Sequence, residues 1–224
     1  MTEHQIIHGE AIETLKTFDS KTIDLIVTDP PYLCNYRDRD GRHVRNDDNA
    51  AAVLGVFPDL YRVLKDDSYL VLFCGWTAIA LFSEAWTRAS FGVGGHIVWG
   101  KDYVSSAKHV QYRHESAWLL TKGRPERTGK ALPDLLSWTY SGNRHHPTEK
   151  AVEVISPLVR SFSKPGDTVL DPFLGSGTTA VAAALNDRRA IGIELEAKYC
   201  DLARARVEGA ERFRARRPTT RRAA

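Results

Sequence analysis

The chain has 224 residues and a formal net charge of +3, with 42% hydrophobic and 26% charged residues, which is typical of a globular protein with a sizeable core. It contains no apolar run long enough to span a membrane and no signal peptide, so we expect a cytoplasmic protein without membrane contact. The three cysteines, Cys34, Cys74 and Cys200, lack paired spacing, which favours a reducing compartment and argues against a zinc site.

Strand and helix patterns alternate along the chain. Apolar runs predict seven strands, near residues 5–7, 23–28, 69–74, 96–99, 116–121, 168–171 and 190–194. Helical patterns fall near residues 10–18, 50–64, 76–88, 151–163 (which Pro157 should kink), 178–187 and 196–214. This alternation indicates an α/β fold, with a mostly parallel sheet covered by helices on both faces. We expect a single domain over residues 1–224.

The motif Asp29-Pro30-Pro31-Tyr32 directly follows the predicted strand at residues 23–28. The two prolines stiffen the backbone and favour an extended Asp29. The Asp29 carboxylate and the proline carbonyls offer acceptors that could hold an exocyclic amino group and aim its lone pair at an electrophile. The Tyr32 ring could stack on a base that has left the duplex. Taken alone, the motif is also compatible with a strand that ends in a proline turn.

Two stretches without apolar periodicity carry basic residues. In the loop at residues 33–49, we expect the basic side chains to cover a base or contact the DNA backbone: Arg37, Arg39, Arg42 and Arg45. An ordinary surface loop is the alternative. The second stretch, residues 122–147, contains further candidates for DNA contact: Lys122, Arg124, Arg127, Lys130, Arg144 and His145. No acid or cysteine completes a metal-ligand spacing with His145 and His146, so no metal is expected.

Residues 168–179 are predicted to form a strand, a glycine turn and the start of a helix. Gly175 and Gly177 allow the backbone to approach a ligand, and the helix start offers N–H groups to an anionic end. The family resemblance described below implies that the cofactor-binding residues of this segment are Asp171, Pro172, Phe173, Gly175, Ser176, Gly177, Thr178 and Thr179. Glu194 ends the next predicted strand, where a carboxylate can accept hydrogen bonds from ribose hydroxyls. The turn matches neither the dinucleotide fingerprint nor a Walker loop.

The C-terminal residues 201–224 hold eight arginines against three acidic residues, so this tail carries more positive charge than the whole chain. Its arginines could contact phosphates, or they could belong to a solvated helix end that frays beyond Pro218. We weigh these two interpretations equally.

Taken together and in this order, the motifs resemble those of S-adenosylmethionine-dependent DNA amino-methyltransferases, in the class whose catalytic motif precedes the cofactor motif. The resemblance covers roughly residues 5–207 and includes Ile97–Lys101, His114–Trp118 and His146–Lys150. It departs from the family pattern at Glu10, where Asp is usual, and at Ala151, where Pro is common. It implies a Rossmann-like methyltransferase fold, with S-adenosylmethionine held by the glycine turn and Glu194 and with Glu10 near its adenine ring.

The resemblance also implies the reaction. Asp29, which also faces the cofactor, and the Pro30 carbonyl would hold the amino group of a flipped base while Tyr32 stacks, and the nitrogen would attack the sulfonium methyl in line. Asp-Pro-Pro-Tyr is commoner among members that act on adenine N6, so adenine in double-stranded DNA is favoured, with cytosine N4 left open. The target-recognition segment, near residues 122–147, is short, which predicts a short or weakly specific site. Many relatives dimerise, so a homodimer is possible.

Two other interpretations stay open at the level of sequence. RNA or protein amide methyltransferases usually carry Asn-Pro-Pro-Tyr after the cofactor motif, which is the reverse of the order here. A non-catalytic DNA-binding relative would not need Asp29, Tyr32, Gly175, Gly177 and Glu194 to be intact.

Overall fold

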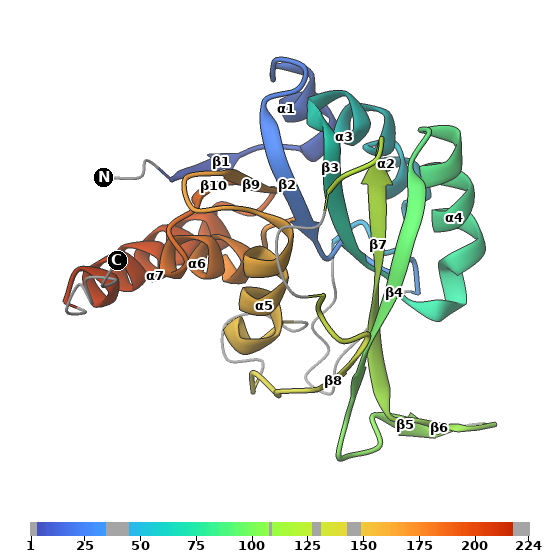
Figure 1. Cartoon of the computed structure of the whole chain (residues 1–224). Coiled ribbons are helices and arrows are strands. Elements are labelled where there is room, and N and C mark those ends of the chain that lie inside the picture. The colour runs from blue at the N-terminus through green and yellow to red at the C-terminus, as the bar shows by residue number, and fades with distance from the viewer. Residues whose placement is uncertain (1–3, 35–44, 108, 127–130, 143–148, 217–224) are drawn as a thin grey trace.

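The computed structural model describes residues 4–34, 45–107, 109–126, 131–142 and 149–216 (Figure 1). Its main sheet has eight strands, in the spatial order β1 (Gln5–His8), β10 (Arg189–Glu194), β9 (Thr168–Asp171), β2 (Ile23–Thr28), β3 (Leu64–Phe73), β7 (His114–Lys122), β4 (Gly92–Gly100) and β8 (Leu135–Ser137). Only β7 runs antiparallel to its neighbours, so the prediction of a mostly parallel sheet is confirmed. The predicted count of seven strands is one short, because β8 has only three residues.

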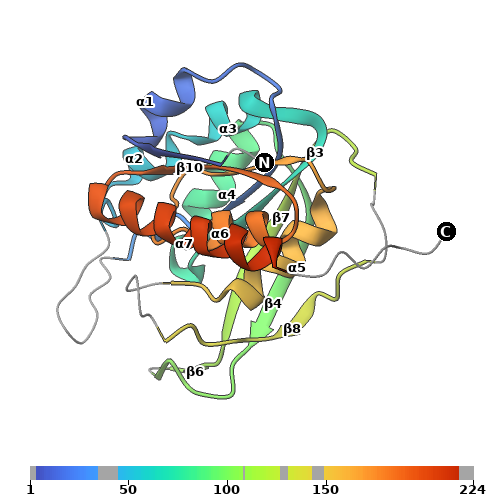
Figure 2. The same cartoon turned by 90° about the vertical axis from the view of Figure 1, so that its left-hand side faces the viewer.

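Helices cover both faces of this sheet, as the sequence predicted (Figure 2). One face packs against α5 (Val152–Phe162), α6 (Thr178–Leu185) and α7 (Ala197–Ala215). The other packs against α1 (Ala11–Lys16), α2 (Ala50–Leu54), α3 (Phe57–Val63), the 3-10 turn η1 (Trp76–Ala78) and α4 (Ile79–Arg88). Side chains alternate between the two cores along each strand: Val169 belongs to the first core and Leu170 to the second. The buried strands therefore read as continuous apolar runs.

The single helix predicted at residues 50–64 is two helices in the structure. Gly55 ends α2, and Pro58 lies in the first turn of α3, where its missing N–H leaves no helical hydrogen bond unmade. In the same way, the helix predicted at residues 76–88 opens with the 3-10 turn η1 before α4.

The parallel strands end at one edge of the sheet, which we call the carboxyl edge. There the register pairs Leu25 of β2 with Val169 of β9, although 144 residues separate them. This pairing brings the end of β2, where Asp29 follows, beside the end of β9, where the glycine turn begins. The small hairpin of β5 (Ser106–Ala107) and β6 (Gln111–Tyr112) extends past the ends of β4 and β7 (Figure 1).

Candidate active site

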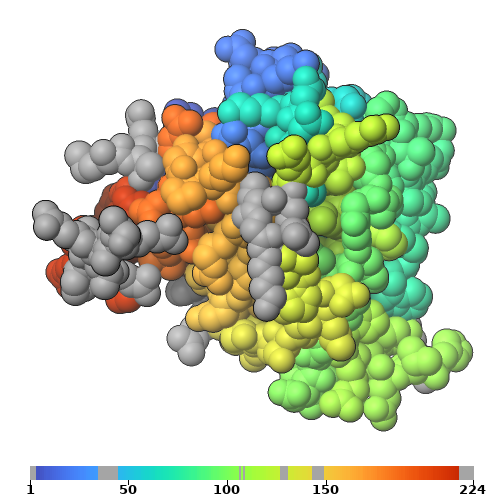
Figure 3. Space-filling view, viewed as in Figure 1, coloured from blue at the N-terminus to red at the C-terminus, as the bar shows by residue number. Residues whose placement is uncertain are grey.

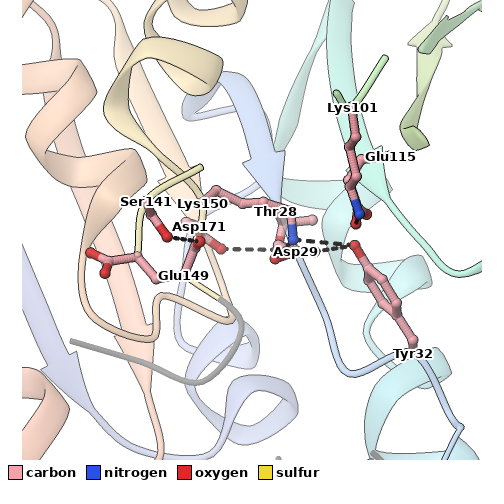
Figure 4. Close-up of polar contacts among 9 residues, drawn as sticks. All are labelled: Thr28, Asp29, Tyr32, Lys101, Glu115, Ser141, Glu149, Lys150 and Asp171. Carbon is pink, nitrogen blue, oxygen red and sulfur yellow. Dashed lines mark hydrogen bonds and ion pairs between the residues drawn. The ribbon is translucent and has the colours of Figure 1, made fainter. Parts of the chain in front are cut away.

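Asp29 is held by two donors at the carboxyl edge (Figure 4). The Tyr32 hydroxyl donates to Asp29 Oδ1 at 2.7 Å, and the Lys150 ammonium donates to Asp29 Oδ2 at 2.5 Å. Lys150 also lies 3.3 Å from the Tyr32 oxygen, and its side chain is only 9% exposed. The sequence analysis predicted that Asp29 and Tyr32 act together, but it gave Lys150 no role. These contacts fix the carboxylate plane from both of its oxygens.

The Tyr32 ring packs against Gly75, at the end of β3. A side-chain Cβ at Gly75 would lie 3.1 Å from the ring, a tight contact, so glycine favours this close approach. Burial, and then the nearby carboxylates of Asp29 and Glu115, raise the pKa of the Tyr32 hydroxyl well above its ordinary value. Tyr32 is therefore a neutral donor to Asp29 at physiological pH.

Glu115 belongs to an ion pair with Lys101 near the Tyr32 hydroxyl (Figure 4). Lys101 follows β4, and its side chain is only 5% exposed. Its ammonium also lies within 6 Å of the ring centres of Tyr103 and Trp138. The ion pair forms a polar boundary of the site on the β4–β7 side, opposite Lys150.

The glycine turn between β9 and α6 adopts left-handed backbone conformations. Gly175 has φ 53° and Gly177 has φ 91°, in the region that other residues rarely adopt. A Cβ at Gly177 would lie 2.7 Å from the Cβ of Ala203 in α7, so this glycine also permits close packing of the turn against the helix. The turn thus leads from β9 into α6, whose first residues, Thr178 and Thr179, line the pocket described below.

Asp171 lies at the base of this turn and is buried. Its Oδ1 atom accepts hydrogen bonds from the Thr28 hydroxyl at 2.9 Å and the Phe173 N–H at 3.1 Å. Burial raises the pKa of the Asp171 carboxyl to about 7, although these hydrogen bonds and one from Thr179 act in the opposite direction. Asp171 therefore ties the end of β2 to the cofactor turn.

Glu194 is positioned at the end of β10 by backbone donors. Its Oε2 atom accepts from the Gly175 N–H and its Oε1 atom from the Glu196 N–H, both at 2.8 Å. Glu10 follows β1, which pairs with β10 so that His8 lies opposite Glu194. The Glu10 carboxylate accepts from the Glu13 N–H at 2.9 Å and caps α1. Both predicted cofactor acids thus lie at the same edge, and each has lone pairs available for a further donor.

A buried polar cluster, absent from the sequence analysis, joins Glu149, Ser176 and Arg206. Arg206 lies 2.8 Å from Glu149 Oε1, and it donates to the Ser176 hydroxyl oxygen at 2.7 Å and carbonyl oxygen at 2.8 Å. The Ser176 hydroxyl in turn lies 3.3 Å from Glu149. The cluster couples the segment before α5 to the cofactor turn. In sequence, Arg206 was one of several tail arginines without a distinguishing signal.

Some of these groups line a pocket that has about 440 Å³ of empty space including its open mouth. Its walls come from the catalytic motif, the cofactor turn and the segment before α5, with polar contributions from Asp29, Lys150, Asp171, Gly175 and Ser176. In the space-filling view, the α5–α7 elements (orange and red) and the green β4–β7 side make up opposite halves of the visible face (Figure 3). Asp29 of the predicted catalytic motif and several residues of the predicted cofactor turn thus line the same pocket, whereas Tyr32, Glu10 and Glu194 are not among its lining residues.

Of the basic residues assigned to DNA contact, the structure describes three: Arg45, Lys122 and Arg124. The structure contradicts the predicted DNA contact of Lys122. Its ammonium is buried and donates to the Tyr61 and Leu64 carbonyl oxygens at 2.7 and 2.6 Å. It pairs with Ser68 near the start of β3, at the edge opposite Asp29. Arg124 is exposed at that far edge, and Arg45 is exposed five residues before α2 begins at Ala50. The remaining assignments lie outside the described residues: Arg37, Arg39, Arg42, Arg127, Lys130, Arg144 and His145.

Four arginines of α7 have partners within the chain. Besides Arg206, these are Arg204 with Ile6 O and Asp201, Arg212 with Glu208, and Arg214 with Ala184 O and Asp187. The described part of the tail therefore fits a packed helix better than a phosphate-binding arm. Residues 217–224 lie outside the described residues.

The described residues contain no group of three or more His, Cys, Asp or Glu side chains arranged to hold a metal ion. Cys34 is exposed, whereas Cys74 and Cys200 are buried, and burial raises the pKa of the Cys74 thiol to about 12. In the described parts of the chain, no helix is both long and apolar enough to cross a membrane.

A family model described as DNA methylase matches residues 23–205. The chain belongs to this DNA methylase family. The methylase is 47% identical over 208 residues to the protein YubD of Escherichia coli (strain K12), covering 93% of this chain and 92% of YubD. It is 28% identical over 250 residues to the DNA adenine methyltransferase YhdJ of the same strain, covering 94% and 84% of the two chains.

Solved structures agree with this assignment. The complex of M1.HpyAVI with S-adenosylmethionine has a TM-score of 0.73 and 26% identity, covering 92% of the methylase and 99% of that chain. The cytosine-N4-specific PvuII DNA methyltransferase also has a TM-score of 0.73, at 18% identity and 96% and 93% coverage, a likeness that shows the fold alone. The methylase is thus an S-adenosylmethionine-dependent DNA amino-methyltransferase with the Rossmann-like methyltransferase fold that its motifs predicted.

Proposed function

We propose that the methylase modifies the N6 amino group of adenine in double-stranded DNA. The observation that carries this proposal is the Asp29 carboxylate, held between the Tyr32 hydroxyl and the Lys150 ammonium at the shared pocket. Asp-Pro-Pro-Tyr resembles the motif of adenine-specific members, and the relative YhdJ is named as a DNA adenine methyltransferase.

In this proposal the catalytic motif holds the target amino group. Asp29 and the Pro30 carbonyl accept its two hydrogens, and Pro31 keeps the backbone rigid between them and Tyr32. A carboxylate has about four lone-pair sites, so Asp29 can accept the amino group while it keeps Tyr32 and Lys150. Gly75 covers one side of the Tyr32 ring, and the base stacks against the ring.

The cofactor turn fits S-adenosylmethionine. The glycines with left-handed backbone conformations allow a ligand to approach the backbone. At the carboxyl edge, the Glu194 carboxylate can accept hydrogen bonds from the ribose hydroxyls, and the Glu10 carboxylate lies near the adenine ring. The other contacts we propose come from the turn itself: Asp171, Pro172, Phe173, Gly175, Ser176, Gly177, Thr178 and Thr179. When bound, S-adenosylmethionine supplies an electrophilic methyl group. Asp171 holds the turn against Thr28, so the cofactor and target sites keep a fixed separation.

DNA contact is assigned to the basic loop at residues 33–49 and to the later, carboxyl-edge part of the recognition segment at residues 122–147. The second assignment follows from the chain path: β8 returns the segment to the carboxyl edge, where the Trp138 N–H donates to the Gly100 carbonyl at 2.9 Å. Lys122 and Arg124 are left out, because they lie at the opposite edge. The short recognition segment would read few base edges.

Single-molecule sequencing of plasmid DNA from a methylation-deficient host tests the base and the target together. The host would express the wild type, Asp29→Ala or the exposed control Asp19→Ala. We expect N6-methyladenine with the wild type and with Asp19→Ala, and none with Asp29→Ala. N4-methylcytosine would overturn the base assignment, and unmodified DNA with a purified protein that binds S-adenosylmethionine would overturn the DNA assignment.

A further inference from the structure

Exposed aromatic rings gather at the carboxyl edge of the sheet. In the described part of the chain, four aromatic side chains rank among the exposed large apolar groups: Trp76 (59% exposed), Tyr103 (41%), Tyr140 (60%) and Phe213 (55%). The first three come from segments that follow β3, β4 and β8, all at this edge. Large exposed rings that contact each other on a polar surface usually mark a binding site.

Trp76 stacks on Tyr112 of the β5–β6 hairpin. The ring centres are 5.3 Å apart with an interplanar angle of 18°, so the two rings are nearly parallel. In both views the hairpin extends beyond the sheet rather than lying on a helix (Figures 1 and 2). The Tyr112 ring is only half-buried, and Trp76 remains mostly exposed even with this partner. The pair therefore presents a flat aromatic surface to the solvent.

This surface begins next to the catalytic tyrosine. Gly75, whose backbone lies against the Tyr32 ring, immediately precedes Trp76. In the proposed function the target base stacks on Tyr32, whose hydroxyl donates to Asp29, so the bound base lies near Gly75 and the segment that carries Trp76. The nucleotides beside that base remain outside the pocket, within reach of groups on its rim.

A second aromatic pair lies on the same edge. Tyr103 and Tyr140 meet edge to face, with ring centres 5.9 Å apart, and Lys101 lies over the Tyr103 ring. Next to the first pair in the chain, Thr77, Gln111 and Arg113 are exposed polar residues, and Val110 is an exposed apolar residue. Flat rings separated by polar and cationic groups suit nucleobases joined by phosphates better than the continuous apolar face of a protein partner.

We propose that the Trp76–Tyr112 pair is a stacking platform for a nucleobase that flanks the target base. This inference rests on the proposed action on DNA and adds a nucleic-acid contact outside the catalytic motif and the basic loops. Stacking tolerates any base, so the platform would strengthen binding without selecting a sequence.

The test compares Trp76→Leu with Trp76→Phe, because leucine fills apolar space without an aromatic face. Phe213→Ala, in α7 and away from this edge, is the matched exposed control. The affinity for a target duplex with 2-aminopurine beside the target base is measured by its fluorescence, together with S-adenosylmethionine affinity and melting temperature. We expect Trp76→Leu to weaken duplex binding by about 5- to 100-fold and to reduce quenching of the flanking probe.

Trp76→Phe should keep most of the affinity, Phe213→Ala should match the wild type, and S-adenosylmethionine binding should stay within about twofold in all three. Wild-type duplex affinity and quenching in Trp76→Leu would overturn the platform. So would an equal loss in Trp76→Phe and Trp76→Leu that tracks a lower melting temperature. Both results are distinct from a failure of the proposed function, which would appear in the wild type as an absence of DNA methylation.

Discussion

Lys150 reaches across the pocket to Asp29, a residue 121 positions earlier in the chain, and donates to Oδ2 at 2.5 Å. The two residues come from opposite halves of the methylase: Asp29 follows β2, and Lys150 precedes α5. The same ammonium lies about 5 Å from the ring centres of Tyr32 and Phe73. Lys150 is therefore a positioning residue that orients the catalytic carboxylate.

Replacing Lys150 should lower turnover much more than binding. Lys150→Met keeps the length of the side chain but removes the donor, so the Asp29 carboxylate is held only by Tyr32. We expect kcat to fall about 100-fold, with KM for DNA within a fewfold of the wild type. Lys150→Arg, which keeps a cationic donor, should retain more of the turnover than Lys150→Met. Equal losses of kcat in the two variants would show that Lys150 does not act by donating to Asp29.

Arg206 should stabilise the cofactor turn. Arg206→Ala removes the cation beside the buried Glu149 carboxylate, and we expect the free energy of unfolding to fall by about 3 kcal/mol. Affinity for S-adenosylmethionine should fall as well, because Ser176 loses two hydrogen bonds from Arg206. Arg212→Ala, which breaks an exposed pair in the same helix, should change stability by less than about 1 kcal/mol. Equal effects of the two changes in denaturant titrations would argue against this role.

Alanine substitutions at Gly177 and Gly166 should distinguish the cost of backbone strain from the cost of a steric clash. Both have φ near 90°, but a Cβ at Gly166 meets nothing within 4 Å, whereas one at Gly177 would meet Ala203 at 2.7 Å. Gly166→Ala should cost about 1–2 kcal/mol of stability from strain alone. Gly177→Ala should cost more and should also weaken S-adenosylmethionine binding, as measured by calorimetry. Similar stability and binding in both variants would contradict the packing described here.

Asp171 should make stability depend on pH. Its pKa is raised from 3.8 to about 7 by folding, so the folded state binds the extra proton between these values. The free-energy cost of burying the ionised Asp171 carboxylate is absent below about pH 4. This cost lowers the stability of the folded state increasingly as the pH rises, and it reaches its full value above about pH 7. Asp171→Asn retains the Oδ1 acceptor and cannot ionise. The stability of the wild type relative to this variant should therefore fall between pH 4 and pH 8, by up to about 4 kcal/mol. A pH-independent difference would show that Asp171 does not carry this linkage.

Lys122 should contribute to stability and not to DNA binding. Lys122→Met leaves the Tyr61 and Leu64 carbonyl oxygens without this donor, and it should cost about 1–3 kcal/mol. Duplex affinity at a temperature where the variant is folded should match the wild type. A loss of affinity without a loss of stability would restore the DNA contact that the sequence suggested.

The sequence predicted the features that depend on local pattern. Apolar runs identified seven strands of the main sheet, and a proline-rich end and a glycine turn marked the two segments that meet at the carboxyl edge. The strand β8 was missed because three residues, Leu135–Ser137, are too few to show a period, and its pairing with β4 is a tertiary contact.

Features that depend on long-range contact could not be predicted. Lys150 and Lys122 both lie near the end of a helix or strand. Nothing in the neighbouring sequence shows that Lys150 donates to Asp29 whereas Lys122 is a buried structural residue. Likewise, the sequence does not distinguish Arg206 from the other arginines of α7. Its contacts with Ser176 and Glu149 arise only because α7 packs against the cofactor turn. In each case the partner lies 30 to 121 residues away in the chain.

The pairing of β2 with β9, and of β1 with β10, also affects how the chain acquires activity during synthesis. Until residues 168–194 have been made, β1 lacks its neighbour β10 and β2 has only β3 beside it, and closing chain segments of this length costs entropy and slows folding. A nascent chain that already carries Asp29 and Tyr32 has no cofactor turn beside them. We therefore expect the enzyme to be inactive on the ribosome until residue 194 has emerged, and a product that ends before the cofactor turn to lack methyltransferase activity.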